Sequence, residues 1–436
     1  MEEVDIIETI LVSPSPPPVS HTLPLSHLDS DRNLHVTFRT LRLYSPNKSS
    51  DLEPFHVISS ALPAALSLYY PLVGSVCPRP SDSRLEVRVC SGDAVPLTRA
   101  TASFRLDRLD LERPGSPLLD RLAPDRDGLA LQVTRFACGG FALGMCIHHA
   151  TCDGAGATMF LSHVARLARG GASPAVEPIW ERELLGPRRP PRVEISFDEV
   201  LRFDHDVASY GPYSKVGGGG DQLVVRECFH VSDACLERFR EGLAEKAGMS
   251  FTTFEALAAF IWRARVKASG IESEETVKMV YSMNISKVLK PALPTGYWGN
   301  VCLPVYVNLT VTQLVEQPLW ETASLIKKSK HGVTTEYVRS YIDFQEVHYA
   351  GGITAGERVS AFTDWRRLGH SELDFGWGGP ITTLPLSWRL LGSRDPCFFL
   401  PYGAMDGRRS QGFKVLVCLP QKALHSFSLD MEMFGG

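Results

Sequence analysis

The densest group of side chains that could do chemistry follows an apolar run in the first half of the chain. It lies in the sequence His148-His149-Ala150-Thr151-Cys152-Asp153-Gly154. A histidine held there suits general-base work, because its unperturbed pKa of about 6.5 lets the neutral ring accept a proton near neutral pH.

Context separates this group from two similar ones. His149 ends a run that we expect to be a buried strand, and Asp153 starts the following helix, where a carboxylate can cap amides or hold a cation. His27 lies in a polar stretch after a proline-rich entry, which predicts a solvated turn. His370 precedes a glycine-rich stretch, which predicts a structural loop. All three histidines belong to the pattern H-x-x-x-D, as His27/Asp31, His149/Asp153 and His370/Asp374.

Two other interpretations of His149 stay open on these residues alone. The first is a core histidine whose nitrogens are satisfied. The second is a metal site with His148, Cys152 and Asp153, but adjacent histidines on a strand point to opposite faces and no second His/Cys cluster completes a ligand set. We therefore expect no metal.

Missing motifs narrow the reaction further. The chain contains no G-x-S-x-G elbow, no phosphate-binding G-x-x-x-x-G-K-[S/T] loop and no strand-anchored G-x-G-x-x-G. A single histidine base without an enzyme nucleophile favours direct group transfer between two bound substrates.

The elements that must position these residues alternate between strand and helix. Residues 129–136 and 141–148, separated by a Gly139-Gly140 turn, predict a hairpin. A helix over 156–169 should follow and stop at the next glycines.

The second half predicts a similar mixture. Ser232 and Gly248 can bound one helix, and Thr252 with Glu255 has the spacing of a capping box that begins the next. Further helices are expected over 320–330 and 420–433, and strands over 278–283, 301–309 and 413–419.

A change of composition between these halves predicts a linker. Prolines, and then the run from Gly217 to Gly220, interrupt regular structure there. We expect an N-terminal domain over 1–185, a crossover linker over 186–225 and a C-terminal domain over 226–436. Both domains should be of the α/β class.

Composition excludes several functions for this chain of 436 residues. Its net charge is −4 and no Lys/Arg block dominates, which gives no footprint for nucleic acid or an anionic membrane. The longest apolar run has about twelve residues, whereas a bilayer requires about twenty. The acidic start Met-Glu-Glu-Val-Asp predicts no import signal, so we expect a cytoplasmic protein with ten reduced cysteines.

Two motifs together resemble the plant BAHD family of acyl-CoA-dependent acyltransferases. His149 to Gly154 is similar to the family motif H-x-x-x-D-G, and Asp374-Phe375-Gly376-Trp377-Gly378 is similar to D-F-G-W-G. Further similarity to the branch with alcohol, taxane and spermidine acyltransferases lies in residues 25–29, 178–185, 252–255, 296–300 and 363–369.

The resemblance implies two chloramphenicol-acetyltransferase-like domains with a channel at their interface. His149 would deprotonate the acceptor, which attacks the thioester without an acyl-enzyme, and Asp153 would orient the loop. Residues Asp374 to Gly378 would be structural, so the His370/Asp374 spacing is a coincidence. Trp298, Thr363 and Trp365 are candidate substrate-binding residues, although such aromatic residues are equally compatible with a core. We expect a monomer with acyl-CoA as co-substrate and no cofactor.

Two departures from the family pattern affect these expectations. An arginine that pairs with the motif aspartate is expected near Ser286, so either Lys287 replaces it or Asp153 lacks that partner. The sequence Tyr297-Trp298-Gly299-Asn300-Val301-Cys302 differs from Y-F-G-N-C, which argues against a malonyl donor.

Transfer to the hydroxyl of a small specialised metabolite is the function we favour. The alternative is N-acylation of a polyamine or aryl amine from a hydroxycinnamoyl- or other aromatic acyl-CoA. An amine acceptor with a pKa of about 10.4 would require a carboxylate near His149, because such an amine is mostly protonated at neutral pH. More distant alternatives are a non-catalytic CoA-ester-binding relative and a peptide-synthetase condensation domain.

Overall fold

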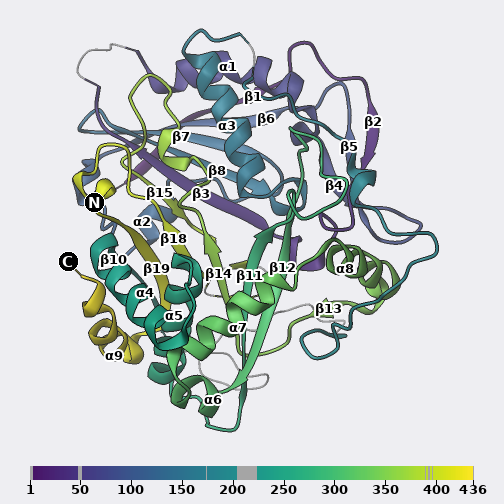
Figure 1. Cartoon of the computed structure of the whole chain (residues 1–436). Helices are drawn as coiled ribbons and strands as arrows, with labels where there is room; N and C mark the ends of the chain where they lie inside the picture. The colour runs from purple at the N-terminus through teal and green to yellow at the C-terminus, as the bar shows by residue number, and fades with distance from the viewer. Residues whose placement is uncertain are drawn as a thin grey trace.

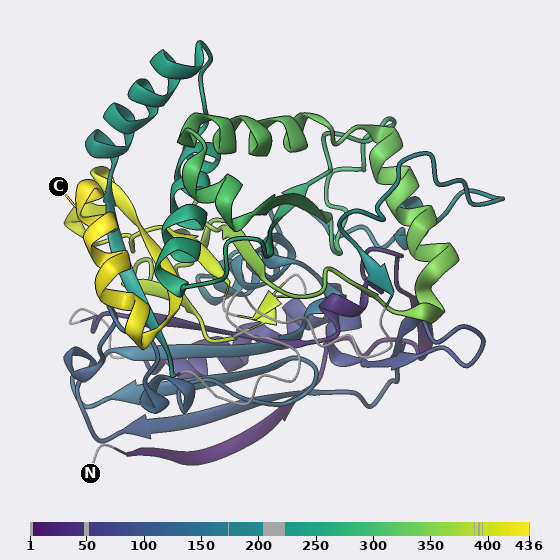
Figure 2. The same cartoon turned by 90° about the horizontal axis from the view of Figure 1, so that it is seen from below.

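Two six-stranded mixed sheets, one built mainly from each half of the chain, form the framework of the computed structural model (Figure 1). The structure describes residues 3–47, 52–172, 174–203, 223–387, 389–390, 393–394 and 396–435. Seen from below, the strands of the first half form one layer, and helices of the second half lie on the far side of the molecule (Figure 2). The two-domain α/β class expected from the sequence is confirmed.

The first sheet carries the strand that ends at the histidine pair. Its strands, in spatial order, are β1 (Val4–Val12), β6 (Val95–Ala102), β7 (Ala130–Phe136), β8 (Phe141–His148), β3 (Thr37–Tyr44) and β15 (Thr382–Pro385). The expected hairpin is β7 and β8, which pair antiparallel. Gly139, in their turn, has a φ of 86°, a conformation that favours glycine.

Two helices cover one face of the first sheet. α1 (Pro54–Leu68) and α3 (Gly154–Ala168) pack against each other, and their apolar side chains share a core cluster with those of β7 and β8. The expected helix after His149 is α3, which begins two residues earlier than the sequence indicates because Asp153 is its N-cap. The short helix α2 (Pro117–Asp120) lies elsewhere in this half.

The second sheet has its own helical cover. Its strands, in spatial order, are β10 (Val224–Ser232), β19 (Gly412–Pro420), β18 (Cys397–Leu400), β14 (Val359–Asp364), β11 (Thr276–Asn284) and β12 (Cys302–Thr310). The helices of this half are α4 (Asp233–Ala247), α5 (Thr253–Ser269), α6 (Val311–Glu316), α7 (Leu319–His331), α8 (Thr335–His348) and α9 (Gln421–Met431). α5 packs against α4, α7 and α9 and contacts β14 and β19.

The helix boundaries predicted for α4 and for the start of α5 in the second half are confirmed. Thr252 and Glu255 form the expected capping box at the start of α5. Gly248 ends α4 in the left-handed conformation, and Ser232 occupies the N-cap of that helix, although its side chain makes no capping hydrogen bond.

One strand crosses between the two halves. After β14, the chain leaves the second sheet, and β15 pairs antiparallel with β3 of the first sheet before the chain returns as β18. The register places Leu384 of β15 opposite Leu41 of β3, and both side chains are fully buried. The second half therefore completes the first sheet.

Smaller sheets and the connection between the halves complete the fold. A three-stranded sheet has the order β2 (His21–Pro24), β5 (Leu85–Val89), β4 (Ser75–Pro78), and the two-stranded sheets pair β9 (Arg202–Phe203) with β13 (Ile353–Thr354) and β16 (Arg389–Leu390) with β17 (Ser393–Arg394). In the connection, Arg188 bonds the carboxylates of Asp343 and Glu336 on α8. The run Gly217 to Gly220 lies outside the described residues.

Over the described parts of the chain, the helices are too short or too polar for any of them to cross a membrane.

Candidate active site

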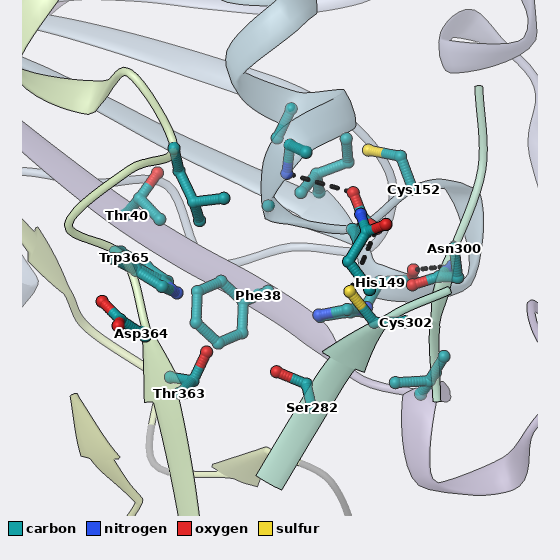
Figure 3. Close-up of a pocket in the computed structure, with 18 of the residues that line it drawn as sticks. Phe38, Thr40, His149, Cys152, Ser282, Asn300, Cys302, Thr363, Asp364 and Trp365 are labelled. Atoms are coloured by element: carbon teal, nitrogen blue, oxygen red, sulfur yellow. Dashed lines mark hydrogen bonds between the residues drawn. The ribbon is translucent and has the colours of Figure 1, made fainter. Parts of the chain in front are cut away.

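A pocket opens between the two sheets and contains the histidine that the sequence singles out. The first half contributes Phe38 and Thr40 of β3 and the His149 loop, whereas the second half contributes Ser282 of β11, among others. Figure 3 shows Cys302 and Thr363 on the side of the second sheet, facing this space. The interface site implied by the resemblance is therefore present.

His149 is the first residue after β8. Its amide donates to the carbonyl of Val36 at 2.9 Å, which continues the pairing of β3 with β8. Its ring meets that of Phe38 edge to face at 5.6 Å. The ring nitrogen Nδ1 is buried and has no hydrogen-bond partner in the described part of the chain.

Burial sets the charge state of this histidine. Loss of water around the ring lowers the pKa of His149 below 6.5, and the nearby Asp153 carboxylate opposes that shift. The ring is therefore neutral at neutral pH, which is the state in which a histidine accepts a proton.

Asp153 joins the histidine loop to the second sheet. Its Oδ1 accepts hydrogen bonds from the amides of Ala155 and Gly156, both at 3.0 Å, at the start of α3. Its Oδ2 accepts from the amide of Val301 at 3.2 Å and from the Cys302 thiol at 3.6 Å. One buried carboxylate thus caps a helix and fixes the strand that faces His149.

The arginine partner expected from the family pattern is absent from the described contacts of Asp153. Ser286 is engaged locally, since both its amide and its hydroxyl bond to Asn284. Lys287 is exposed and does not replace the arginine. Asp153 Oδ2 is instead held by the Val301 amide and the Cys302 thiol.

A buried network that sequence reasoning missed holds the histidine loop from behind. Asp29 accepts from the guanidinium of Arg182 and, at 2.8 and 2.9 Å, from the amide and side chain of Asn300. Asn300 also donates to the carbonyl of His149 at 2.9 Å, and Arg182 donates to the carbonyl of Thr151 at 3.0 Å. All three network residues lie in segments that carry the family resemblance, which was the available signal.

The turn around His27 is buried, contrary to the solvated turn that we expected. Asp29 and Asp31 are 0% and 5% exposed. Asp31 accepts from the Tyr341 hydroxyl at 2.9 Å, and His27 bonds Glu346 at 2.6 Å. Asp31 and His27 thus have partners on α8, whereas Asp29 is held by Arg182 and Asn300. Partners far away in sequence satisfy these polar side chains, which therefore do not need water.

Residues Asp374 to Gly378 form a compact loop on the first sheet. Asp374 accepts from the amides of Gly376 and Gly378 at 2.7 and 2.8 Å. The two glycines have φ values of 105° and 78°, which other residues rarely adopt. Phe375 packs against Tyr44, and Trp377 packs against Phe141. None of the five loop residues is among those that line the pocket.

The three candidate substrate-binding residues divide into two groups. Thr363 and Trp365 line the pocket at the end of β14. Trp298 lies outside the pocket lining, in the core, where it donates to the carbonyl of Gly156 at 3.1 Å and packs against Trp180. Its placement corrects our expectation, because the indole supports the first turn of α3.

His370 also lines the pocket, although the sequence indicated only a structural loop. It contacts Thr158 of α3 and Arg42 of β3, whereas Asp374 bonds its own loop and Arg169. The H-x-x-x-D spacing of His370 and Asp374 thus corresponds to no contact between them. The position of His370 depends on the crossing segment that leads to β15, which no local pattern revealed.

Two further carboxylates reach the pocket, and both have partners. Asp364 forms an ion pair with Arg366 at 2.6 Å. Asp31 is held by hydrogen bonds, and burial raises its pKa. Within the described residues, no group of three or more His, Cys, Asp or Glu side chains could hold a metal ion.

Comparison with known proteins identifies the family. Residues 2–434 match the model of the Transferase family. The chain belongs to the BAHD family of acyltransferases. As a BAHD enzyme, it is an acyl-CoA-dependent acyltransferase, as the sequence predicted.

Several curated BAHD-like relatives match almost the whole chain. The identity is 33% over 98% of this chain and 95% of the 3'-N-debenzoyl-2'-deoxytaxol N-benzoyltransferase of Taxus canadensis. It is 30% over 97% of this chain and 93% of the spermidine coumaroyl-CoA acyltransferase of Arabidopsis thaliana. It is also 30% over 98% of this chain and 96% of the taxadien-5-alpha-ol O-acetyltransferase of Taxus cuspidata.

The fold of this BAHD chain is also similar to that of a solved structure. Vinorine synthase superposes with a TM-score of 0.72 at 18% identity, covering 99% of this chain and 98% of that one. At this identity the likeness concerns the fold alone.

Proposed function

We propose that this enzyme transfers an acyl group from an acyl-CoA thioester to the hydroxyl group of a small specialised metabolite, with His149 as the general base. The observation that carries the proposal is a neutral histidine in a pocket lined by both sheets. Such a pocket can hold two substrates against one ring.

The chemistry follows from that arrangement. His149 accepts the proton of the acceptor hydroxyl while its oxygen attacks the thioester carbonyl, which gives a tetrahedral intermediate. The intermediate re-forms its carbonyl and expels the CoA thiolate, which takes the proton from the imidazolium. Asp153 has no part in the proton transfer; it positions the loop through the start of α3 and through Val301.

Charge in the pocket favours a hydroxyl acceptor over a polyamine. A protonated polyamine needs carboxylates without partners, whereas Asp364 already forms an ion pair and Asp31 is held by Tyr341 and Gln345. The pocket lining also includes Arg42, whose side chain is a cation. A second cation would therefore be unfavourable there.

N-acylation remains the second candidate because the similarity to two N-acylating relatives supports it. An aryl amine is the more suitable acceptor of this kind, since it is neutral at neutral pH and needs no carboxylate partner.

A paired assay tests the proposal. The purified protein is incubated with acetyl-CoA or benzoyl-CoA and either benzyl alcohol or spermidine, and the release of free CoA thiol is followed. We expect thiol release with the alcohol. Release with amines alone would contradict O-acylation, and no release above that of His149→Ala with any pair would contradict the transferase proposal.

We further propose that the enzyme acts as a cytoplasmic monomer without a cofactor, divided into domains near residues 186–225. One chain supplies both walls of the pocket, and the ten cysteines are free, which suits a reducing compartment. Size-exclusion chromatography with light scattering tests the monomer.

A further inference from the structure

Arg42 is a buried cation that no carboxylate balances. It lies on β3, on the same face as Phe38 and Thr40, and its side chain is 0% exposed. Its guanidinium donates to the Thr40 hydroxyl at 3.0 Å and approaches Nδ1 of His370 at 3.5 Å, while Nε has no partner. Among the described residues, no acidic side chain forms an ion pair with it.

This arginine keeps its charge despite its burial. Loss of water lowers the pKa of Arg42 to about 10, so the side chain stays protonated at neutral pH. An uncompensated buried charge costs several kcal/mol. Such a residue suits a site that receives its counter-ion from a ligand.

His370 lies next to Arg42 and offers a second unused polar atom. The ring is 2% exposed, its Nδ1 lies 3.0 Å from the Thr158 hydroxyl, and its Nε2 is buried without a partner. Burial and the Arg42 cation lower the pKa of His370 well below 6.5, so the ring is neutral. Arg42 can only donate, so its contact with Nδ1 belongs to the tautomer that carries the proton on Nε2, and in that tautomer Nε2 is a free donor.

Both residues belong to the wall of the pocket that also contains His149. Trp365 packs against His370 at 4.8 Å and against Phe38 at 5.9 Å, and Phe38 in turn meets His149. In Figure 3, Thr40 and Trp365 lie on one side of Phe38 and His149 lies on the other. Two aromatic rings therefore line the path from the base to the cationic wall.

We propose that Arg42 and His370 form an anion-binding subsite of the pocket, which recognises a carboxylate carried by one of the two substrates. The inference rests on the proposed acyl transfer and specifies its substrate class. One buried cation and one neutral donor balance the single negative charge of a carboxylate, whereas a phosphate dianion would leave a charge unpaired. The two aromatic rings suit an apolar spacer between that carboxylate and the reacting group.

The carboxylate can belong to the acceptor, as in an aromatic hydroxy acid, or to the acyl group, as in a dicarboxylic monothioester. Matched substrates separate these sources. The acceptor arm compares para-hydroxymethylbenzoate with its methyl ester, using acetyl-CoA. The donor arm compares glutaryl-CoA with pentanoyl-CoA, using benzyl alcohol.

We expect the wild-type protein to prefer the substrate with the carboxylate in one arm, measured as the ratio of the two kcat/KM values. Arg42→Leu should reduce this ratio by roughly 10- to 100-fold, the range of a charge-assisted hydrogen bond. Arg42→Lys should retain part of the preference. Arg39→Leu is the matched control, because Arg39 lies on the opposite face of β3 and donates to Asp120. It should leave the ratio unchanged.

If Arg42 had a purely structural role, Arg42→Leu would lower kcat/KM equally for both substrates of a pair, and this result would overturn the proposal. Equal kcat/KM values of the wild type for both substrates in both arms would also overturn it. If Arg42→Leu does not fold, His370→Phe, which keeps a ring but removes the donor, must lower the same ratio.

Failure of the transferase itself is distinguishable. If no pair of substrates gives thiol release, the melting temperature tests the subsite. Para-hydroxymethylbenzoate must then raise the melting temperature of the wild type more than its methyl ester does, and this difference must disappear in Arg42→Leu. No difference would overturn the subsite.

Discussion

His149 combines three properties that a general base needs. It lines a pocket shared by both halves of the chain, its ring is neutral because burial lowers its pKa, and its backbone is fixed by hydrogen bonds at both its amide and its carbonyl. The adjacent His148 differs, because its Nδ1 accepts from the amide of Ala150 and it is not part of the pocket wall.

Replacing His149 should therefore lower the catalytic efficiency strongly. We expect His149→Ala to reduce kcat/KM by roughly 10²- to 10⁴-fold, the contribution of a positioned proton acceptor. Thiol release at several acceptor concentrations measures the loss. His148→Ala is the neighbouring control and should lose less than tenfold; equal losses in the two variants would contradict the assignment.

The pH dependence of the reaction provides a second test. The His149 pKa lies below 6.5, so kcat/KM should hold steady at neutral pH and fall as the pH drops through that lower pKa. Asp153 raises the His149 pKa, so Asp153→Asn should move this acidic fall to lower pH. Profiles of kcat/KM against pH measure both, and a fall centred above 6.5 or an upward shift would oppose the argument.

At the scale of elements, the histidine loop depends on contacts between distant segments. Asn300 connects the carbonyl of His149 to Asp29, and Arg182 connects the carbonyl of Thr151 to the same carboxylate. All three network side chains are at most 3% exposed, so none of them can exchange its partner for water.

Asn300→Ala should lower both stability and turnover. It leaves buried acceptors on His149 and Asp29, each costing about 1–3 kcal/mol. We expect a lower midpoint of urea unfolding and a fall in kcat that exceeds any rise in KM, because the base is displaced.

Asn308→Ala provides the comparison within the same stretch of chain. Asn308 lies on β12, away from the pocket, and donates to the carbonyl of Glu199. Asn308 is half-buried, so its replacement should lower the free energy of unfolding by about 0.5–1.5 kcal/mol, the contribution of one hydrogen bond. Equal effects of the two variants on kcat would contradict the positioning role of Asn300.

These elements also indicate how far sequence reasoning reaches. The β7/β8 hairpin and the capping box of α5 follow from neighbouring residues, so periodicity and spacing predicted both. The burial of Asp29 and the pocket position of His370 depend on partners more than 150 residues away. No local pattern contains such contacts, and Trp298 was misplaced for the same reason.

At the scale of the molecule, β15 makes the two halves interdependent. It belongs by sequence to the second half but completes the first sheet beside β3. The segment before it carries Trp365 and His370 to the pocket, so the same excursion closes the sheet and builds one wall of the site.

A destabilising substitution in β15 should therefore weaken the structure of both halves. Leu384→Ala removes a fully buried side chain and should lower the free energy of unfolding by about 2–5 kcal/mol. Amide hydrogen exchange should accelerate in β3 and also in β14, which leads into the crossing segment. Leu11→Ala, at a β1 position that is 71% exposed, is the control and should change neither strand. Acceleration confined to β3 would contradict the coupling.

The crossing strand also bears on the construction of hybrid enzymes. A chimera that joins the first half of this chain to the second half of a homologue at the linker would import a foreign β15 against the native β3, and a foreign residue at the position of His370 against Arg42. Recombination designs should take residues 365–387 from the parent that supplies the first sheet. Donor and acceptor preferences can then be exchanged while the native contacts of β15 with β3 are kept.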